Sequence, residues 1–244
     1  MLSLKFAHAI ELNNMLLIRH LLLVLSNVLL LMPMTHAFEP IILGIPDFKP
    51  FTYTENGSIK GIAVSDVNAV FKGIDTTLSI KQYGNYSLLL KALKKGEIDG
   101  FFLATKNSER DRYAVFSKAI RYNNWTWFTL KGNDINPEHS DFKYQSIVGT
   151  IGKTNTFRWL SRNGYQVKSE SAEELLTALL NKDIHAAFLA EKVFENTYKE
   201  AGLSPNTFNR YIEIKRPFSI YISKTYLSAN PNFMEILNSN IPEI

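Results

Sequence analysis

The sequence predicts an α/β protein with two similar lobes, a mainly parallel sheet in each lobe and a cleft between them. Two observations support this. First, residues 89–106 and 175–192 align without a gap, 86 residues apart, and nine of their eighteen positions are identical. Second, strand-like apolar runs alternate with helix-like segments along the chain. The alternative is that helix–turn–strand units look alike in any α/β protein.

Residues 1–37 are predicted to be a signal peptide rather than part of the fold. An apolar run at 21–32 follows Arg19, and Thr35-His36-Ala37 has the small-residue pattern at which signal peptidases cut. The run is shorter than the roughly 20 residues that span a bilayer. We therefore expect cleavage after Ala37 and a periplasmic protein. The alternatives are an uncleaved anchor and a start at Met15.

The composition excludes several classes of function. The 207 residues after Ala37 suffice for one large domain or two small lobes. The chain has no cysteine, which excludes disulfides and thiol catalysis. Beyond the leader only His139 and His185 remain, in no ligand spacing, so we expect no metal and no cofactor. The net charge of +4 falls to +3 without the leader, and no basic cluster predicts nucleic-acid binding.

The first lobe is predicted over residues 38–126, and its elements follow from local patterns. Short apolar or alternating runs indicate strands, Asn-Gly indicates a hairpin turn, and Gly96 suits a helix C-terminus. In order, we expect a strand at 41–45, a hairpin turning at Asn56-Gly57, a helix at 61–71, a strand at 78–83, a helix at 86–95 and a strand at 98–104.

The second lobe is predicted over residues 127–216, with the first crossing at the polar break 131–137 after a strand at 125–130. Ser171 and Glu174 form a capping box ahead of the second copy of the repeat. The remaining expected elements are strands at 146–152, 165–168 and 211–214, helices that begin near Phe157 and Glu191, and a return to the first lobe over 217–244 with a strand at 217–222 and a helix at 233–237.

The two copies of the repeat end at equivalent places, Ala104-Thr105-Lys106 and Ala190-Glu191-Lys192. Ligands of open α/β sheets bind beyond the carboxyl ends of the strands, so we expect both ends to face one cleft. Arg110 follows the first strand end, and a guanidinium can hold a carboxylate through two parallel hydrogen bonds. The alternative interpretations are a solvated charged loop for Arg110 and a helix-dipole partner for Glu191.

Further candidates surround these strand ends. Thr154 and Thr156 lie at a helix start, where backbone amides and hydroxyls favour an anion. Phe51, Tyr53 and Tyr86 lie in loops or at a helix start, where their rings could cover an apolar or cationic group. For the three aromatic residues, packing in the core is the alternative.

Several short motifs follow one another in a fixed order along the chain. They are Pro50-Phe51, Glu55-Asn56-Gly57, Gly61-Ile62, Leu93 to Asp99, and Asn107 to Arg110 followed by Phe116-Ser117. This ordered set resembles the family 3 periplasmic solute-binding proteins, which serve polar amino-acid ABC importers, over residues 38–238. The resemblance implies the type II periplasmic-binding-protein-like fold and an Arg110 that binds the carboxylate of an amino acid. It also places the family's amine-binding acid at Ala190, next to Glu191.

We therefore expect a binding protein that is not an enzyme. A small carboxylate-bearing, amino-acid-like solute would bind between the lobes, with contacts from Ala104 and Thr105, and pass to an inner-membrane ABC permease. The protein is expected to be a monomer. One alternative is a periplasmic dehydratase-like enzyme in which Glu191 is the general acid. Another is a sensory receptor that uses the same cleft without transport.

Overall fold

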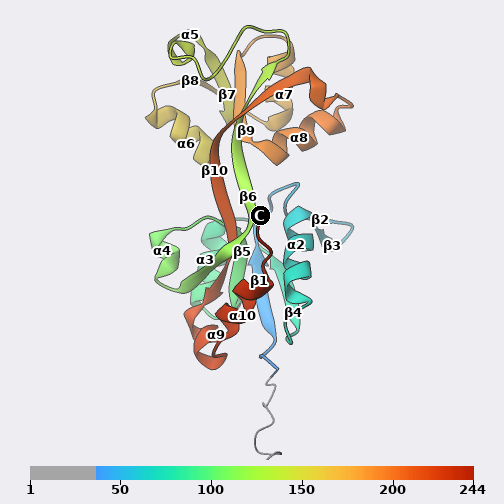
Figure 1. The fold of residues 1–244 in the computed structure, drawn as a ribbon, viewed down its shortest axis with the longest axis vertical. Coiled ribbons are helices and arrows are strands. Elements are labelled where there is room, and N and C mark those ends of the chain that lie inside the picture. The colour runs from blue at the N-terminus through green and yellow to red at the C-terminus, as the bar shows by residue number, and fades with distance from the viewer. Residues whose placement is uncertain (1–36) are drawn as a thin grey trace, which may run out of the picture. The chain divides into compact units, whose positions relative to one another are not determined.

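Eight strands form one hydrogen-bonded sheet that continues from the first lobe into the second, in the order β4-β1-β5-β10-β6-β9-β7-β8. This computed structural model describes residues 37–244, so the predicted signal peptide, apart from Ala37, lies outside the described residues. The pairings of β1 with β4 and β5, and of β7 with β8 and β9, are parallel. The predicted α/β class with a mainly parallel sheet in each lobe is confirmed (Figure 1).

The first lobe contains the beginning and the end of the described chain. Asn56 and Gly57 take positive φ angles at the predicted hairpin turn. The lobe's elements are strands β1 (Ile41–Ile45), β2 (Tyr53–Glu55), β3 (Ser58–Lys60), β4 (Leu78–Gln82) and β5 (Gly100–Ala104), and helices α2 (Ile62–Phe71), α3 (Tyr86–Lys94), α4 (Ser108–Asp111), α9 (Lys224–Ala229) and α10 (Phe233–Asn240). The sequence patterns did not predict α9.

The second lobe is built from one continuous stretch of chain. Its predicted capping box is present, because Ser171 accepts from the amide of Glu174 and the Glu174 carboxylate accepts from the amide of Ser171. The elements are β7 (Ile147–Ile151), β8 (Gln166–Glu170), β9 (Ala186–Ala190), α5 (Phe142–Gln145), α6 (Asn155–Arg162), α7 (Ala172–Leu180), α8 (Glu191–Glu200) and the 3-10 turn η1 (Pro205–Thr207).

The sequence repeat corresponds to a structural repeat with the same spacing. Helix α7 begins 86 residues after helix α3, and strand β9 begins 86 residues after strand β5. The turn between helix and strand is also repeated: the Asp99 carboxylate accepts from the amide of Ile42 at 2.8 Å, and the Nδ1 atom of His185 accepts from the amide of Ile147 at 2.9 Å. Asp99 and His185 therefore perform the same structural task in the two lobes.

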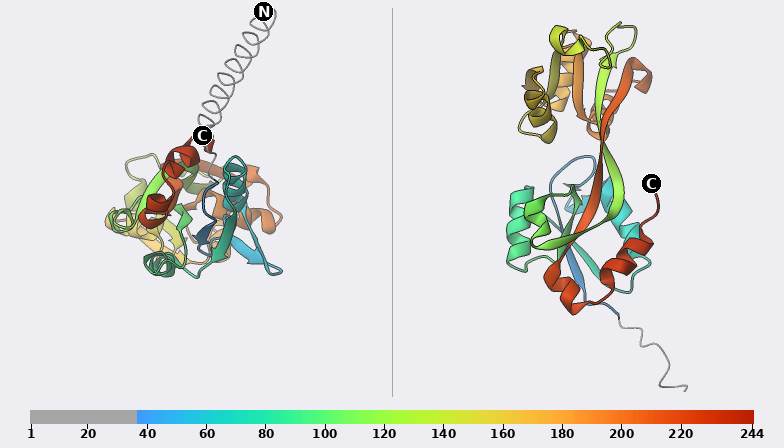
Figure 2. Two further views of the ribbon diagram at one scale, coloured as in Figure 1. Left: turned by 90° about the horizontal axis from the view of Figure 1, so that it is seen from below. Right: turned by 60° about the vertical axis from the view of Figure 1, so that its left-hand side comes forward.

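Two long antiparallel strands, β6 (Ala114–Leu130) and β10 (Phe208–Ser223), connect the lobes (Figures 1 and 2). In the first lobe β10 pairs with β5, and in the second lobe β6 pairs with β9 from Trp125 to Phe128. The chain therefore crosses within β6 before Trp125, and the predicted crossing at 131–137 is wrong. The polar residues 131–137 follow the end of β6 and lie inside the second lobe. The lobe boundaries at 126/127 and 216/217 stay predictions.

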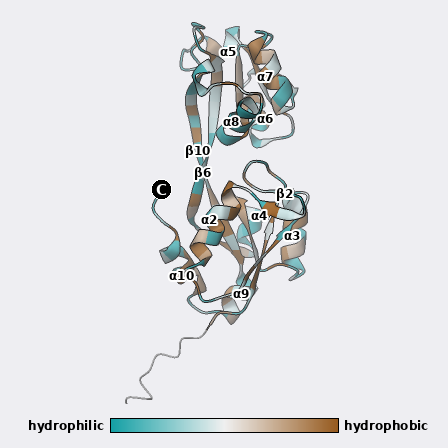
Figure 3. Cartoon of the chain, turned by 90° about the vertical axis from the view of Figure 1, so that its right-hand side faces the viewer, coloured by the Kyte–Doolittle hydropathy of each residue, from teal (hydrophilic) through white to brown (hydrophobic). Residues whose placement is uncertain are grey.

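Between the lobes, β6 and β10 pair only with each other among the described strands. At this point Tyr122 lies opposite Pro217, and Asn124 lies opposite Lys215. Figure 3 shows mainly hydrophilic colouring on this ribbon, and apolar cores lie on either side of it. A two-stranded polar ribbon between two packed cores is the part of the fold best suited to bend.

Each lobe has its own apolar core. In the first lobe, buried side chains of β1, α2 and α10 pack against Ile220 and Ile222 of β10. In the second lobe, buried side chains of α7, β9 and α8 pack together around Phe194. Within residues 37–244, no helix combines the length and the apolar character needed to cross a bilayer.

Candidate ligand-binding cleft

A cavity of about 820 Å³ lies between the lobes and is lined by residues of both lobes and of β6 and β10. This volume is in the range of small-molecule sites. Five predicted site residues line it: Tyr86, Thr105, Arg110, Thr154 and Thr156. The structure thus brings together residues that are up to 70 positions apart in the sequence.

Arg110 is held at the first-lobe wall by neutral groups. Asn107 caps α4 by accepting from the amide of Glu109 at 2.8 Å, which fixes the start of this short helix. The Nη1 atom of Arg110 donates to the carbonyl of Thr105 at 3.0 Å, and its Cζ lies 4.6 Å from the ring centre of Tyr86. No carboxylate within residues 37–244 forms an ion pair with Arg110. Its remaining donors are therefore available to an anionic ligand.

Tyr86 is anchored beneath this guanidinium. Its hydroxyl donates to the carbonyl of Leu103, a fully buried residue with a φ of +61° at a bulge in the pairing of β5 with β10. A left-handed leucine is strained and is kept only where its surroundings enforce it. Burial raises the pKa of Tyr86 well above its usual value, although Arg110 opposes the shift. Tyr86 is therefore a neutral platform for Arg110.

The second-lobe wall begins at α6, whose first turn is fixed by three hydroxyls. Thr154 accepts from the amide of Phe157 at 3.2 Å and donates to the carbonyl of Ile151 at 2.5 Å. The hydroxyl of Thr156 lies 2.8 Å from that of Thr154 and 2.9 Å from that of Thr150. Because these hydroxyls bond one another and the backbone, their evident task is to hold the start of α6 against the cavity.

The linking strands form the floor of the cavity. Trp125 and Arg216 line it, and the Cζ atom of Arg216 lies 5.0 Å from the ring centre of Trp125. Asn123 also lines it; its Oδ1 atom is buried and has no hydrogen-bond partner in the described residues. Because adjacent strand residues face opposite sides, Asn123 and Trp125 face this cavity whereas Asn124 lines a separate cavity.

Four other predicted site residues do not line the cavity. Ala104 is fully buried and pairs with Ser219 of β10. Phe51 is fully buried and packs against Phe48 and Phe218, which do line the cavity, at centroid distances of 5.2 and 5.7 Å. Tyr53 lies on the hairpin strand β2, with Lys49 Nζ 5.7 Å from its ring centre. The fourth is Glu191.

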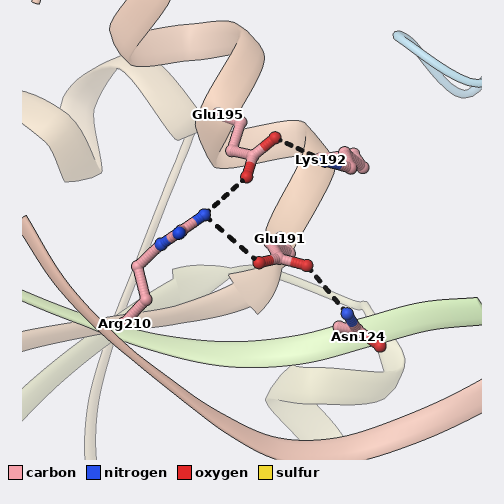
Figure 4. Close-up of polar contacts among 5 residues, drawn as sticks. All are labelled: Asn124, Glu191, Lys192, Glu195 and Arg210. Carbon is pink, nitrogen blue, oxygen red and sulfur yellow. Dashed lines mark hydrogen bonds and ion pairs between the residues drawn. The ribbon is translucent and has the colours of Figure 1, made fainter. Parts of the chain in front are cut away.

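Glu191 belongs to a cluster of polar side chains with Asn124, Glu195 and Arg210 (Figure 4). Glu191 and Asn124 line the second cavity, which has a volume of about 670 Å³. Strand β9 ends at Ala190, so Glu191 is the first residue of α8. Its carboxylate accepts from Asn124 Nδ2 at 2.8 Å and lies 3.6 Å from Arg210 Nη1. Glu195 pairs with the same guanidinium at 3.0 Å. Ala190, not Glu191, lines the interlobe cavity.

Sequence reasoning missed most of the cations of the interlobe cavity. The lining includes Lys106, Lys153, Arg158, Arg162 and Arg216, none of which was a predicted site residue. The one available signal was Arg158 and Arg162, which lie four residues apart on α6 and therefore share a helix face with Trp159 between them in the sequence. Within residues 37–244 no group of three or more acidic, histidine or cysteine side chains could hold a metal ion.

Two lobes, two linking strands and a cavity between the lobes define the class of type II periplasmic-binding-protein-like domains. The model of the bacterial extracellular solute-binding proteins, family 3, matches residues 41–244, and the chain belongs to this family. The resemblance seen in the sequence motifs is thus confirmed. A comparison with curated protein sequences finds no match.

Solved structures share the fold at low sequence identity. The second substrate-binding domain of a putative amino acid ABC transporter from Streptococcus pneumoniae has 19% identity and a TM-score of 0.65, covering 83% of this chain and 91% of that one. The GluR0 ligand-binding core from Nostoc punctiforme, in complex with L-glutamate, has 16% identity and a TM-score of 0.60, covering 83% and 91%. The BvgS VFT2 domain of Bordetella pertussis has 15% identity and a TM-score of 0.61, covering 83% and 86%.

Proposed function

We propose that this chain binds a small carboxylate-bearing solute in the interlobe cleft, and that Arg110 holds the carboxylate. The observation that carries the proposal is the placement of Arg110, which lines the cavity over Tyr86, with no carboxylate partner in residues 37–244. A guanidinium already oriented by a ring and a carbonyl loses little entropy when it binds a carboxylate.

The fold supports a closing motion around the solute. The ribbon of β6 and β10 is two strands wide between the lobes, so bending there would move the α6 wall toward Arg110. Closure removes water from the ion pair, which strengthens the attraction between guanidinium and carboxylate. The residues that we assign to the first-lobe side of the site are Tyr86, Thr105 and Arg110.

The proposed setting is extracytoplasmic. Family membership supports export, and the proposed route is the signal peptide with cleavage after Ala37. The proposed partner is an inner-membrane ABC permease that takes the solute from a monomeric protein. A sensory role for the same cleft is the second candidate, because a histidine kinase sensor domain with similarity to periplasmic binding proteins also shares the fold, with 15% identity and a TM-score of 0.61 over 84% of this chain and 90% of that one. Co-purification with a permease rather than with a kinase would support transport.

Intrinsic fluorescence offers a direct assay, since Trp125 and Trp159 line the cavity. Titration with a panel of small carboxylic and amino acids should change this fluorescence for the acids that bind. Native mass spectrometry of the purified protein should identify any solute retained from the cell. Substitution Arg110→Ala should weaken binding by about 10- to 100-fold, the effect of losing a charge-assisted hydrogen bond.

Arg112→Ala is the matched control, because Arg112 ends the same helical turn but does not line the cavity. It should bind each acid as the unaltered protein does. Equal affinities of the Arg110→Ala variant and the unaltered protein would refute the role of Arg110.

A further inference from the structure

The lining of the interlobe cavity is strongly basic. It contains six basic side chains and a single acidic one, Asp47. The basic residues are Lys106 and Arg110 in the first lobe, Arg216 on β10, and Lys153, Arg158 and Arg162 in the second lobe. Within residues 37–244 none of the six forms an ion pair.

The positive charge of the cavity lining is not shared by the rest of residues 38–244. Residues 1–37 contribute +1 of the net charge of +4, so residues 38–244 carry +3. The cavity lining carries +5, and the other residues of 38–244 therefore sum to −2. Residues 38–244 contain three arginines outside the cavity lining, and two of them are paired, Arg121 with Asp66 at 2.7 Å and Arg210 with Glu195 at 3.0 Å. All four arginines of the lining lack an ion pair within the described residues.

Neutral groups hold the cavity's guanidiniums in place. Arg110 lies over Tyr86, Arg216 lies over Trp125, and Arg158 Nη1 donates to the carbonyl of Lys153 at 3.1 Å. Each contact orients a guanidinium without cancelling its charge. Because the three come from the first lobe, the linking strand and the second lobe, an anion in the cavity is attracted from all sides.

The charge of a ligand decides whether the basic lining attracts it or repels it. Like charges confined around one cavity repel, and the repulsion is relieved only by an anion. A single carboxylate offsets one cation, whereas two or three anionic groups can contact both walls. An ammonium group would meet six cations and could pair only with Asp47, which lies on an exposed loop. Ala190, at the end of β9, offers it no charge.

We propose that the ligand is a small polyanion without an ammonium group, a di- or tricarboxylate or a phosphorylated carboxylic acid. One anionic group would bind Arg110, and another would bind the second-lobe cations around Arg158. This inference rests on the proposed function, since it specifies the solute that the same cleft takes. It also predicts that binding weakens as ionic strength rises, more steeply for dianions than for monoanions.

Matched pairs of acids test the proposal by calorimetry on the protein without its leader. Glutarate and L-glutamate differ only by the ammonium group, as do succinate and L-aspartate. Glutarate and succinate should each bind at least about tenfold more tightly than the amino acid, which is the effect of about 1.4 kcal/mol. Tricarballylate and 3-phosphoglycerate complete the panel. Tighter binding of one or the other identifies whether the further anionic group is a carboxylate or a phosphate.

Three variants distinguish the charge argument from simple loss of fold. Arg158→Gln should weaken glutarate binding severalfold more than butyrate binding, and Arg112→Gln should change neither. Asp47→Asn should leave glutarate affinity equal or higher, because it removes the one negative charge of the lining. Circular dichroism spectra should match among the variants.

The outcomes separate this inference from the proposed function. L-Glutamate binding as tightly as glutarate, with Asp47→Asn weakening it and Arg110→Ala weakening it too, would overturn the polyanion proposal and leave the carboxylate site in place. Failure of every acid to bind the folded protein would overturn both. Tight binding of amine-free acids that persists in Arg110→Ala would retain the polyanion preference and overturn the assignment of Arg110.

Discussion

Gly149 on β7 has no space for a side chain, and this predicts a measurable loss of stability in Gly149→Ala. A Cβ atom at Gly149 would lie 2.4 Å from Leu175 Cδ2 and 2.6 Å from Ile184 Cδ1. Ordinary contacts begin about 1 Å further out. Both neighbours are buried, with Leu175 at 0% and Ile184 at 2% exposure, so neither can move into solvent.

Overpacking of this kind costs about 1–3 kcal/mol. For a protein of this size each kcal/mol lowers the melting temperature by about 2–4 °C, so the expected decrease is about 2–12 °C. Urea denaturation followed by circular dichroism would measure the free energy of unfolding. Gly84→Ala is the control, because a Cβ there would meet only Leu88 Cδ1 at an ordinary 3.7 Å.

The repeat extends the prediction to the first lobe. At Gly44 a Cβ atom would lie 2.4 Å from Leu89 Cδ2 and 2.8 Å from Ile98 Cδ1, the counterparts of Leu175 and Ile184. Gly44→Ala should therefore cost about as much as Gly149→Ala. In the second lobe Ile184→Val removes one clashing methyl, so the double variant should lose less stability than the sum of its single variants. A Gly149→Ala variant within about 0.5 kcal/mol of the unaltered protein would refute the packing argument.

Three further predictions concern buried or half-buried polar groups. His185→Ala should lower the free energy of unfolding by about 0.5–1.5 kcal/mol, because the Nδ1 acceptor is lost. His185→Asp should lose less stability, because Asp99 accepts the equivalent hydrogen bond in the first lobe. Urea denaturation measures both variants, and equal losses in the two would contradict this reasoning. Glu195 is 7% exposed and pairs with Lys192 at 2.7 Å and with Arg210 at 3.0 Å. Glu195→Ala should therefore lower the free energy of unfolding by about 1.5–3 kcal/mol. Glu200→Ala should cost much less, because the ion pair of Glu200 is exposed, and equal losses in the two variants would contradict this prediction. Burial and the nearby Asp111 carboxylate raise the pKa of Tyr221 from 10.0 to about 12. The contribution of Tyr221 to the free energy of unfolding should therefore be complete below pH 10 and decline as the pH rises to 12. The free energy of unfolding measured across this range should decline less steeply in Tyr221→Phe, and an unchanged slope would contradict the shift.

The repeat made the core of the fold predictable. Both copies contain a Leu-Leu helix face and an Ile before the strand, and these residues pack on Gly44 and Gly149 at equivalent points. The long strands β6 and β10 were not predicted at their full length. Tyr122 to Asn124 and Lys215-Arg216 lie outside the predicted strands at 125–130, 211–214 and 217–222, because a two-stranded ribbon that is polar on both faces needs no alternation of apolar residues.

The cleft was predictable only in part. Arg110, Thr105 and Tyr86 follow or precede a strongly apolar strand, so their place at one edge of the sheet could be inferred. The orientation of Glu191 could not, although a helix start near it was predicted, because its partners Asn124 and Arg210 come from the linking strands β6 and β10. Nor could the basic lining be inferred, since Lys106, Arg158 and Arg216 come from separate segments that only the folded chain brings together.

The position of β10 in the sheet also has a consequence for how the chain folds during synthesis. β10 lies between β5 and β6, and its Ile220 and Ile222 are fully buried in the first-lobe core with Phe233. The strands β7, β8 and β9 of the second lobe, by contrast, all lie between residues 147 and 190. We therefore expect the second lobe to fold first, and the first lobe to stay incomplete until the last part of the chain has emerged. A chain that completes its N-terminal lobe last stays unfolded for longer during synthesis, and this is compatible with the export that we propose.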